Sequence, residues 1–209
     1  MIASHGPDDL EPLLPSASEW AALTFEESGP SLPSGVPGHC PIVGAIDLDL
    51  LRDGEAVRVE GRAGTVEIPG VSETNVVTSF LESDDGRLLL LRRSPRVGSF
   101  PGRWAGVSGY IEDEEPESAA RREILEETGV GSERLVLLAS GRPVYARDGA
   151  RVFRVHPFRY RVAGRKITID WEHTEHEWVD PSEIDRRETV QKLPRVYRAT
   201  WSGDLRRNR

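Results

Sequence analysis

The distribution of apolar positions predicts a chain that is rich in β-strands and poor in helices. From residue 71 onward, short apolar runs are separated by polar segments, and the turn Ser83–Gly86 lies between the first two runs. Runs of this length that are rich in valine and leucine are typical of strands. The predicted strands are Val76–Leu81, Leu88–Leu91, Leu135–Ser140 and Val152–Val162, the last of which includes Pro157.

Helical periodicity is strong in one segment, Glu117–Thr128, and moderate in a second, Val190–Thr200. In the second segment Pro194 predicts either a kink or a late start of the helix. Several strands with one strong helix among them predict an α+β fold with a sandwich core.

The first 70 residues follow a different pattern from the rest. Residues 28–44 contain four prolines and are predicted to be a loop or linker. Residues 53–68 alternate around a glycine-containing turn, which predicts a β-hairpin. Residues 36–70 also resemble the C-terminal part of swivelling β-domains. We predict a small β-rich appendage over residues 1–70, a main domain over 71–200 and a basic tail over 201–209.

The composition excludes several classes of protein. With 37% hydrophobic residues the chain can form an ordinary core, and no apolar run is long enough to span a membrane. The single cysteine, Cys40, cannot form an internal disulfide, so we expect a cytoplasmic setting without a membrane partner. A net charge of -8 argues against a nonspecific nucleic-acid binder, which needs a basic surface.

Most of the excess negative charge lies in residues 109–130, where eight acidic side chains stand against two arginines. On a helix, Glu123, Glu126 and Glu127 fall within an arc of about 100° on one face. Carboxylates placed in this way repel one another unless a hard cation such as Mg²⁺ lies among them. The alternative interpretation is a solvated acidic face.

The order of the residues favours the metal site. Residues 122–130 read REILEETGV and resemble the second half of the Nudix box, R-E-aliphatic-x-E-E-x-G-aliphatic. The resemblance implies an α/β/α Nudix sandwich and a Mg²⁺-dependent pyrophosphohydrolase, with Mn²⁺ as a substitute ion. It assigns Glu123, Glu126 and Glu127 to metal binding and catalysis. It also implies that Arg122 orients a box carboxylate and that the carbonyl of Gly109 reaches the metal.

The box departs from the family pattern at one point. The spacing between Gly109 and Arg122 is one residue shorter than in the family, and the contraction lies in the loop before the helix. Counting from Gly109 makes Glu115 the early box glutamate, whereas counting back from Arg122 makes it Glu114. Both assignments stay open.

Further candidates flank the box. Arg92, Arg93 and Arg103 are candidates for binding substrate phosphates, or arginines that simply flank a strand. Trp104 and Phe100 are candidates for stacking on a base, or core residues. Downstream, the resemblance implies an extra acid that serves as general base, and the candidates are Glu172, Glu175 and Glu177, with Glu175 preferred.

Two histidines stand beside these glutamates, at positions 173 and 176. A zinc site would need further nitrogen or sulfur ligands, which the surrounding sequence does not supply. We therefore interpret His173 and His176 as loop residues that lie near the substrate entrance or are solvated.

The predicted function is hydrolysis of a diphosphate linkage in a nucleoside diphosphate derivative, such as a nucleotide-sugar or a related small molecule. Two alternatives stay open. One is a Nudix-fold domain that binds a ligand without catalysis. The other is RNA 5′-end or cap hydrolysis, which the net positive charge of residues 185–209 favours. The family resemblance also suggests a homodimer.

Overall fold

The structure is a computed structural model that describes residues 2–3, 22–23, 42–43, 47–60 and 65–201. The chain divides into two compact units, Met1–Ser72 and Glu73–Arg209. The predicted linker at residues 28–44 lies outside the described residues except for Ile42–Val43. Cys40 and all of the predicted tail beyond Trp201 also lie outside them.

The first unit contains short strands. Three of them pair in parallel, and they are β1 (Ile2–Ala3), β2 (Ala22–Leu23) and β3 (Ile42–Val43). β4 (Arg58–Glu60) and β5 (Thr65–Glu67) pair antiparallel, with Val59 opposite Val66. These two strands confirm the predicted hairpin, and its turn lies outside the described residues.

The second unit is built on an eight-stranded sheet. Its strands are β6 (Ser72–Glu82), β7 (Leu88–Arg93), β8 (Trp104–Ala105), β9 (Val107–Tyr110), β10 (Leu135–Ser140), β11 (Val144–Asp148), β12 (Arg151–Val162) and β13 (His173–Val179). The main order is β10-β12-β6-β7-β13, while β11 pairs with β12, β8 with β7 and β9 with β6. The four predicted strands of this unit are confirmed as β6, β7, β10 and β12.

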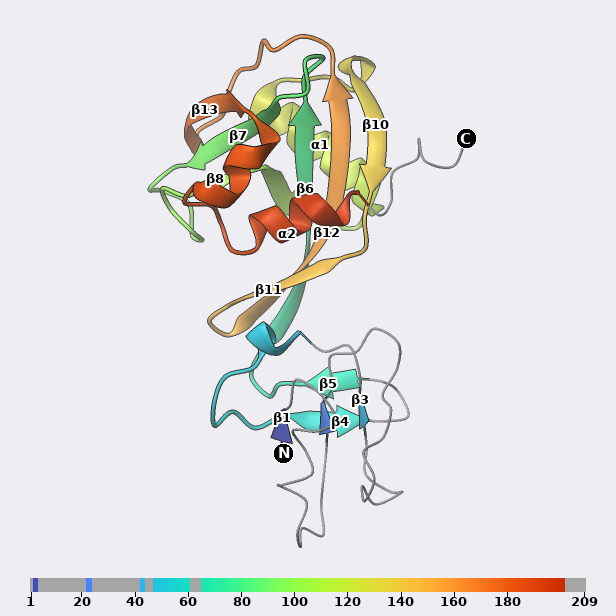
Figure 1. Ribbon diagram of the computed structural model, residues 1–209, viewed down its shortest axis with the longest axis vertical. Helices are drawn as coiled ribbons and strands as arrows, with labels where there is room; N and C mark the ends of the chain where they lie inside the picture. Colours follow the sequence, from blue (N-terminus) through green and yellow to red (C-terminus); the bar gives the residue numbers. More distant parts are fainter. Residues whose placement is uncertain (1, 4–21, 24–41, 44–46, 61–64, 202–209) are drawn as a thin grey trace, which may run out of the picture. The chain divides into compact units, whose positions relative to one another are not determined.

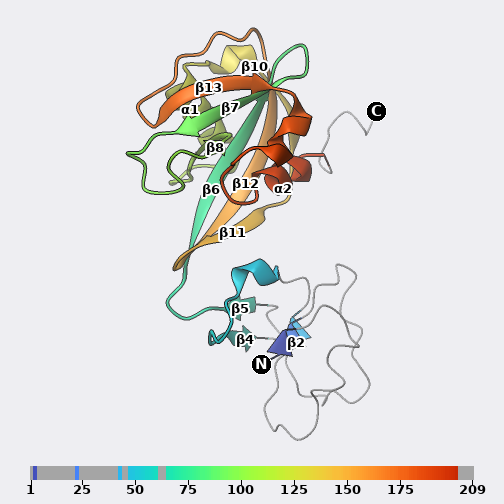
Figure 2. The same cartoon turned by 60° about the vertical axis from the view of Figure 1, so that its left-hand side comes forward.

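Helices cover both faces of this sheet, as Figures 1 and 2 show. The helix α1 (Pro116–Thr128) lies on one face, and the short α2 (Leu193–Ala199) lies on the other beside the 3₁₀ turn Pro181–Arg186. The arrangement confirms the predicted α/β/α sandwich. Helix α2 begins only at Leu193, so Pro194 marks a late start, where a missing N–H costs nothing.

Alternation along the strands explains why the sheet holds two helical layers. In β7, Leu89 and Leu91 pack in the core cluster that contains Ile124 of α1, whereas Leu88 and Leu90 pack in the cluster that contains Leu193 of α2. A strand buried on both faces reads as a continuous apolar run rather than an alternating one. The LLLL segment is therefore the centre of the sandwich.

In the second unit, four described strands were not predicted: β8, β9, β11 and β13. The largest correction concerns residues 173–179, where two histidines were interpreted as loop residues and the structure has β13, an edge strand of the main sheet. Its side chains are mostly polar because an edge strand is only partly covered. Across the described residues, none of the helices is both long enough and apolar enough to cross a membrane.

Candidate active site

The acidic helix α1 aims its carboxylates by helical periodicity. It starts after Glu115 with Pro116 in its first turn, and it ends at Gly129, whose φ of 66° is left-handed and whose N–H bonds the carbonyl of Leu125. Glu123 and Glu127 are one turn apart, and their side chains are 12% and 4% exposed. Glu126 lies at the edge of the same arc and is 56% exposed. The predicted face therefore has two covered carboxylates and one that faces solvent.

Glu127 is the most unusual of the three. Its Oε1 accepts a bond from the backbone N–H of Ser108 at 3.3 Å, while its Oε2 is buried without a hydrogen-bond partner. Burial, together with the nearby carboxylate of Glu123, raises the pKa of Glu127 well above its usual value, and the Ser108 N–H only partly offsets this. A buried carboxylate oxygen without a donor is costly unless a proton or a cation reaches it.

Position 109 requires glycine because the carboxyl group of Glu123 fills the space that a side chain at this position would occupy. A Cβ built at Gly109 would overlap the Glu123 carboxyl carbon and both of its oxygens. Gly109 lies in β9, opposite Val77 of β6, which brings the backbone close to the helix. Burial also raises the pKa of Glu123, although the ion pair with Arg122 acts in the opposite direction.

Arg122 connects the carboxylates of the box. Its guanidinium bonds Oε1 of Glu114 at 2.8 and 3.0 Å, Glu123 at 2.7 Å, Glu126 at 3.1 Å and the carbonyl of Tyr110 at 3.0 Å. These contacts decide which early glutamate belongs to the network. Glu114 is bound by Arg122, whereas Glu115 caps the helix backbone without a side-chain bond. Arg122 thus binds the glutamate that counting back from Arg122 gives.

A second acidic group comes from the segment before β13. Asp170 and Glu172 both act on Glu127 electrostatically and raise its pKa, and Glu172 does the same to Glu123. The loop that carries Asp170 is tied to the end of α1 because the N–H of Thr168 bonds the carbonyl of Thr128 at 2.9 Å. Asp170 was missed in the sequence, although it begins the segment 170–180 in which an extra acid was expected, because only the glutamates of that segment were considered.

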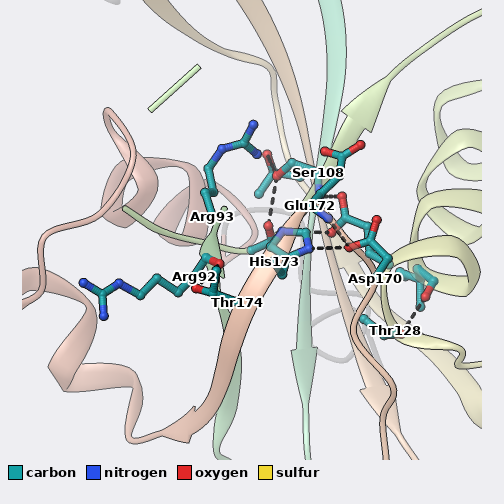
Figure 3. Close-up of polar contacts among 12 residues, drawn as sticks. Arg92, Arg93, Ser108, Thr128, Asp170, Glu172, His173 and Thr174 are labelled. Atoms are coloured by element: carbon teal, nitrogen blue, oxygen red, sulfur yellow. Dashed lines mark hydrogen bonds and ion pairs between the residues drawn. The ribbon is translucent and has the colours of Figure 1, made fainter. Parts of the chain in front are cut away.

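His173 stands between these two groups, as Figure 3 shows. Its side chain is 1% exposed, its Nδ1 lies 2.8 Å from Oδ1 of Asp170, and its Nε2 lies 3.8 Å from Oε2 of Glu127. Burial lowers the pKa of His173 despite the opposing influence of Asp170. The interpretation of this histidine as a solvated loop residue was wrong, whereas His176 is exposed on β13.

The other candidate bases lie elsewhere on β13. Glu175 pairs with Arg92 at 2.5 Å, and Glu177 pairs with Arg187 at 2.6 Å. Glu175 is opposite Arg92 in the sheet, and Glu177 is opposite Leu90. Leu90 packs on the α2 side, so alternation places both glutamates on the face away from α1. Of the three candidates, only Glu172 is brought next to Glu123 and Glu127.

Glu123 and Glu172 line a cleft of about 160 Å³. Its polar lining includes Arg93, Ser99, Glu123 and Glu172, and its apolar lining includes Phe100, Phe153 and Val155. Arg93 is held there by bonds to the carbonyl and hydroxyl of Ser99. Phe100 adopts a φ of 48°, an uncommon backbone conformation for a bulky residue.

The structure places the other predicted substrate residues away from this cleft. Arg92 is paired with Glu175 and, in Figure 3, points away from His173. Arg103 lies 3.4 Å from Glu188 on the surface. Trp104 packs against the α2-side core with the guanidinium of Arg187 over its ring. None of these three is among the residues that line the cleft.

The residues of the site fit a divalent cation in chemistry, although they do not form a ready-made cage. Within the part of the chain that the structure describes, no three acidic, histidine or cysteine side chains converge tightly enough to define a metal cluster. However, the partnerless Oε2 of Glu127 is buried and surrounded by three further carboxylates. Hard oxygen donors with excess negative charge are what Mg²⁺ prefers.

Comparison with known proteins identifies the family. Residues 73–200 match the family model described as NUDIX domain. The nucleoside triphosphatase NudI of Klebsiella pneumoniae is 32% identical over 122 residues, which is 52% of this chain and 83% of that protein. The chain therefore belongs to the Nudix family. It is an enzyme of the pyrophosphohydrolase class within that family.

Solved structures agree on the fold. The Ap4A hydrolase of C. elegans matches with a TM-score of 0.53 at 16% identity, over 62% of this chain and 96% of that one. The MutT protein of Methanosarcina mazei Go1 matches with a TM-score of 0.53 at 23% identity, over 63% of this chain and 96% of that one. At these identities the likeness concerns the architecture alone.

Proposed function

We propose that the chain hydrolyses a diphosphate linkage in a nucleoside diphosphate derivative, with Mg²⁺ bound at Glu127. The observation that carries the proposal is the buried, partnerless oxygen of Glu127 at the centre of four carboxylates, beside a cleft that also presents an arginine. A site with this charge attracts a cation, and the cation in turn attracts phosphate oxygens. A non-catalytic binding domain is less consistent with this arrangement, because every carboxylate of the box is present.

We assign a separate role in hydrolysis to each residue of the site. Glu123, Glu127 and the exposed Glu126 would hold the cation, which polarises the diphosphate and lowers the pKa of the attacking water. Arg93 would bind a phosphate oxygen in the cleft. Arg122 would keep Glu123 and Glu126 in place.

Glu172 is better placed than Glu175 to take the proton of the attacking water. Glu172 lines the cleft together with Glu123, whereas Glu175 is neutralised by Arg92. A general base must come within hydrogen-bond reach of the proton that it removes. We therefore propose Glu172 for the role that the sequence led us to predict for Glu175.

The lining of the cleft supports a small substrate with an aromatic group. Phe100 and Tyr110 could stack on a base, and the apolar walls fit the pattern of a small-molecule pocket. NudI, which is 32% identical to this chain over 122 residues, is named as a nucleoside triphosphatase, which supports a nucleotide-type substrate. A nucleotide-sugar or a related small molecule, in a cytoplasmic setting, remains our proposal for the substrate class.

RNA as a substrate gains no support from the described residues. In the basic segment, Arg198 pairs with Asp185, and Arg187 pairs with both Glu177 and Glu183. These cations bind the domain's own carboxylates and so contribute less to a surface that could neutralise a phosphate backbone.

A panel of nucleotide-sugars, dinucleotides and nucleoside triphosphates, with products identified by mass, tests the proposal. We expect Mg²⁺-dependent release of a nucleoside monophosphate or of pyrophosphate from at least one class. The variant Glu127→Gln should lower kcat by about 10³-fold or more, since it removes a carboxylate that the cation requires.

Two further variants separate the candidate bases. Glu172→Gln should lower kcat by about 10²- to 10⁴-fold. Glu175→Gln is the matched control three residues further along the chain and should stay within about threefold of wild type, because its carboxylate only pairs with Arg92. Wild-type turnover by Glu127→Gln on the best substrate would refute the assignment of the site.

A further inference from the structure

A buried histidine faces the partnerless oxygen of the site. Nε2 of His173 and Oε2 of Glu127 lie 3.8 Å apart, and both side chains are almost completely buried. This separation is too long for a hydrogen bond, which needs about 2.7 to 3.2 Å between nitrogen and oxygen. The two atoms therefore face each other without a direct bond.

Asp170 determines which nitrogen of His173 carries the proton. Its Oδ1 lies 2.8 Å from Nδ1 of the ring, and a carboxylate oxygen can only accept. Nδ1 is therefore the donor, and Nε2 of the neutral ring presents a lone pair towards Oε2 of Glu127. Two buried lone pairs that face each other are unfavourable unless a positive charge lies between them.

A divalent cation fits this gap. At zinc sites the bonds to histidine nitrogen and carboxylate oxygen are each about 2.0 to 2.2 Å long, and a cation with bonds of this length can join atoms up to about 4.2 Å apart. The 3.8 Å between Nε2 and Oε2 lies within this limit. Histidine ligands also commonly donate a hydrogen bond from the N–H of their other ring nitrogen to a carboxylate, as Nδ1–H of His173 does to Asp170.

A β-bulge places His173 on this side of the sheet. His173 pairs with Arg93 and Glu175 pairs with Arg92, so Thr174 is an extra residue in the ladder between β13 and β7. Residues two apart normally share a face, but the extra residue puts His173 on the α1 side and Glu175 on the other. Bulges often redirect a side chain beside an active site.

We propose that His173 supplies a nitrogen ligand, through Nε2, to the divalent cation held by Glu127, with Asp170 orienting the imidazole. The proposal rests on the proposed function, since it concerns the same cation. It adds a ligand outside the box, from the strand at the sheet edge. Because imidazole nitrogen suits transition metals better than Mg²⁺, His173 should raise the affinity of the site for Mn²⁺ more than its affinity for Mg²⁺.

Pulsed electron paramagnetic resonance of the Mn²⁺-loaded full chain tests the ligand directly. We expect the spin-echo modulation of a directly bound ¹⁴N nucleus, which changes to the ¹⁵N pattern when the protein contains ¹⁵N-histidine. The coupling should vanish in His173→Gln and persist in His176→Gln, the exposed control on the same strand. Because the labelled wild-type protein gives a result by itself, a variant that misfolds leaves the test intact.

Calorimetric titration with Mn²⁺ and with Mg²⁺ provides the second measurement. In His173→Gln the affinity for Mn²⁺ should fall by about 10- to 100-fold, and the affinity for Mg²⁺ by less. Bound Mn²⁺ without histidine coupling in the wild type, or coupling that survives His173→Gln, would overturn the inference. If either result were obtained while hydrolysis still required Mg²⁺ and Glu127, the proposed function would stand and only the role of His173 would be wrong. A wild-type protein that binds neither ion at millimolar concentration would contradict both the role of His173 and the proposed function.

Discussion

At the scale of single residues, the site keeps two carboxylates in places that disfavour their charge. Glu123 and Glu127 are both covered, and burial is the largest cause of the raised pKa of each. Only Glu123 has a cationic partner, Arg122, whereas Glu127 has a single backbone donor. Such a group stabilises a bound cation and destabilises the cation-free fold, which is a common compromise at active sites.

The raised pKa of Glu127 predicts how stability depends on pH. The folded chain holds a proton that the unfolded chain releases above its ordinary pKa of 4.5. Unfolding is therefore increasingly favoured as the pH rises from that value towards the folded pKa, and stability falls over this window. Glu127→Gln removes the effect, so without divalent cations its Tm at pH 8 should exceed that of the wild type.

Thermal unfolding in chelator, measured at pH 5 and pH 8, checks this prediction. The difference between the variant and the wild type should be smaller at pH 5, because the stability lost through the raised pKa of Glu127 accumulates as the pH rises above 4.5. A variant that is less stable than the wild type at both pH values would show that the charge of Glu127 is not the cause.

Sequence reasoning reached the residues of the box but not those that approach it from β13. The order of residues around Arg122 was enough to predict a site on the helix, because helical spacing fixes which side chains share a face. The positions of Asp170 and His173 depend on a loop tied to the end of α1 and on the extra residue Thr174 in the ladder. The preference for Glu175 among the three glutamates came from the family resemblance, and the order of residues could not show that Thr174 is an extra residue in the ladder.

At the scale of elements, the end of α1 determines where the last box carboxylates lie. The helix stops one residue after Glu127, where Gly129 turns the chain at a φ of 66° and closes the last turn through its N–H. The carbonyl of Thr128 is then free to hold the loop that carries Asp170. The C-terminal cap of α1 thus holds the loop with Asp170 and Glu172 close to the box carboxylates of the helix.

Gly129→Ala should therefore destabilise the domain. A Cβ at this φ costs about 1 kcal/mol or slightly more, which for a domain of this size lowers Tm by roughly 4 °C. The nearest atom to such a Cβ is 3.8 Å away in Thr168, so the cost is conformational and involves no clash. Gly98→Ala, with open space and no positive φ, is the control and should leave Tm within about 1 °C. Equal Tm values for the two variants would contradict the role of the cap.

The elements that sequence reasoning missed share a physical cause. β13 carries the polar sequence HTEHEWV because it is an edge strand, and β9 contains Gly109 because a carboxyl group needs the space. In each case a neighbour, rather than intrinsic strand propensity, decides the residue type. The hairpin of β11 and β12 had a usable signal, the turn Gly149-Ala150 with glycine at its first position, which was not recognised.

At the scale of the whole molecule, both apolar core clusters and every described residue of the site belong to the second unit. The clusters on the two faces of the sheet draw their buried residues from positions 77 to 197. The acidic group and the cleft beside it lie between residues 76 and 196. The family match, over residues 73–200, covers the same part of the chain.

A fragment that contains residues 71–209 should therefore fold and hydrolyse substrate without the first 70 residues. A unit with its own core can fold alone, because the burial that offsets chain entropy is contained within it. We expect its Tm to lie within about 3 °C of that of the full chain, and its kcat and KM within about threefold. A second fragment that starts at residue 83 removes β6, the strand between β12 and β7, and should not fold. If the first fragment folds but its KM rises by an order of magnitude, residues 1–70 take part in binding the substrate, and the division between appendage and catalytic domain would be wrong.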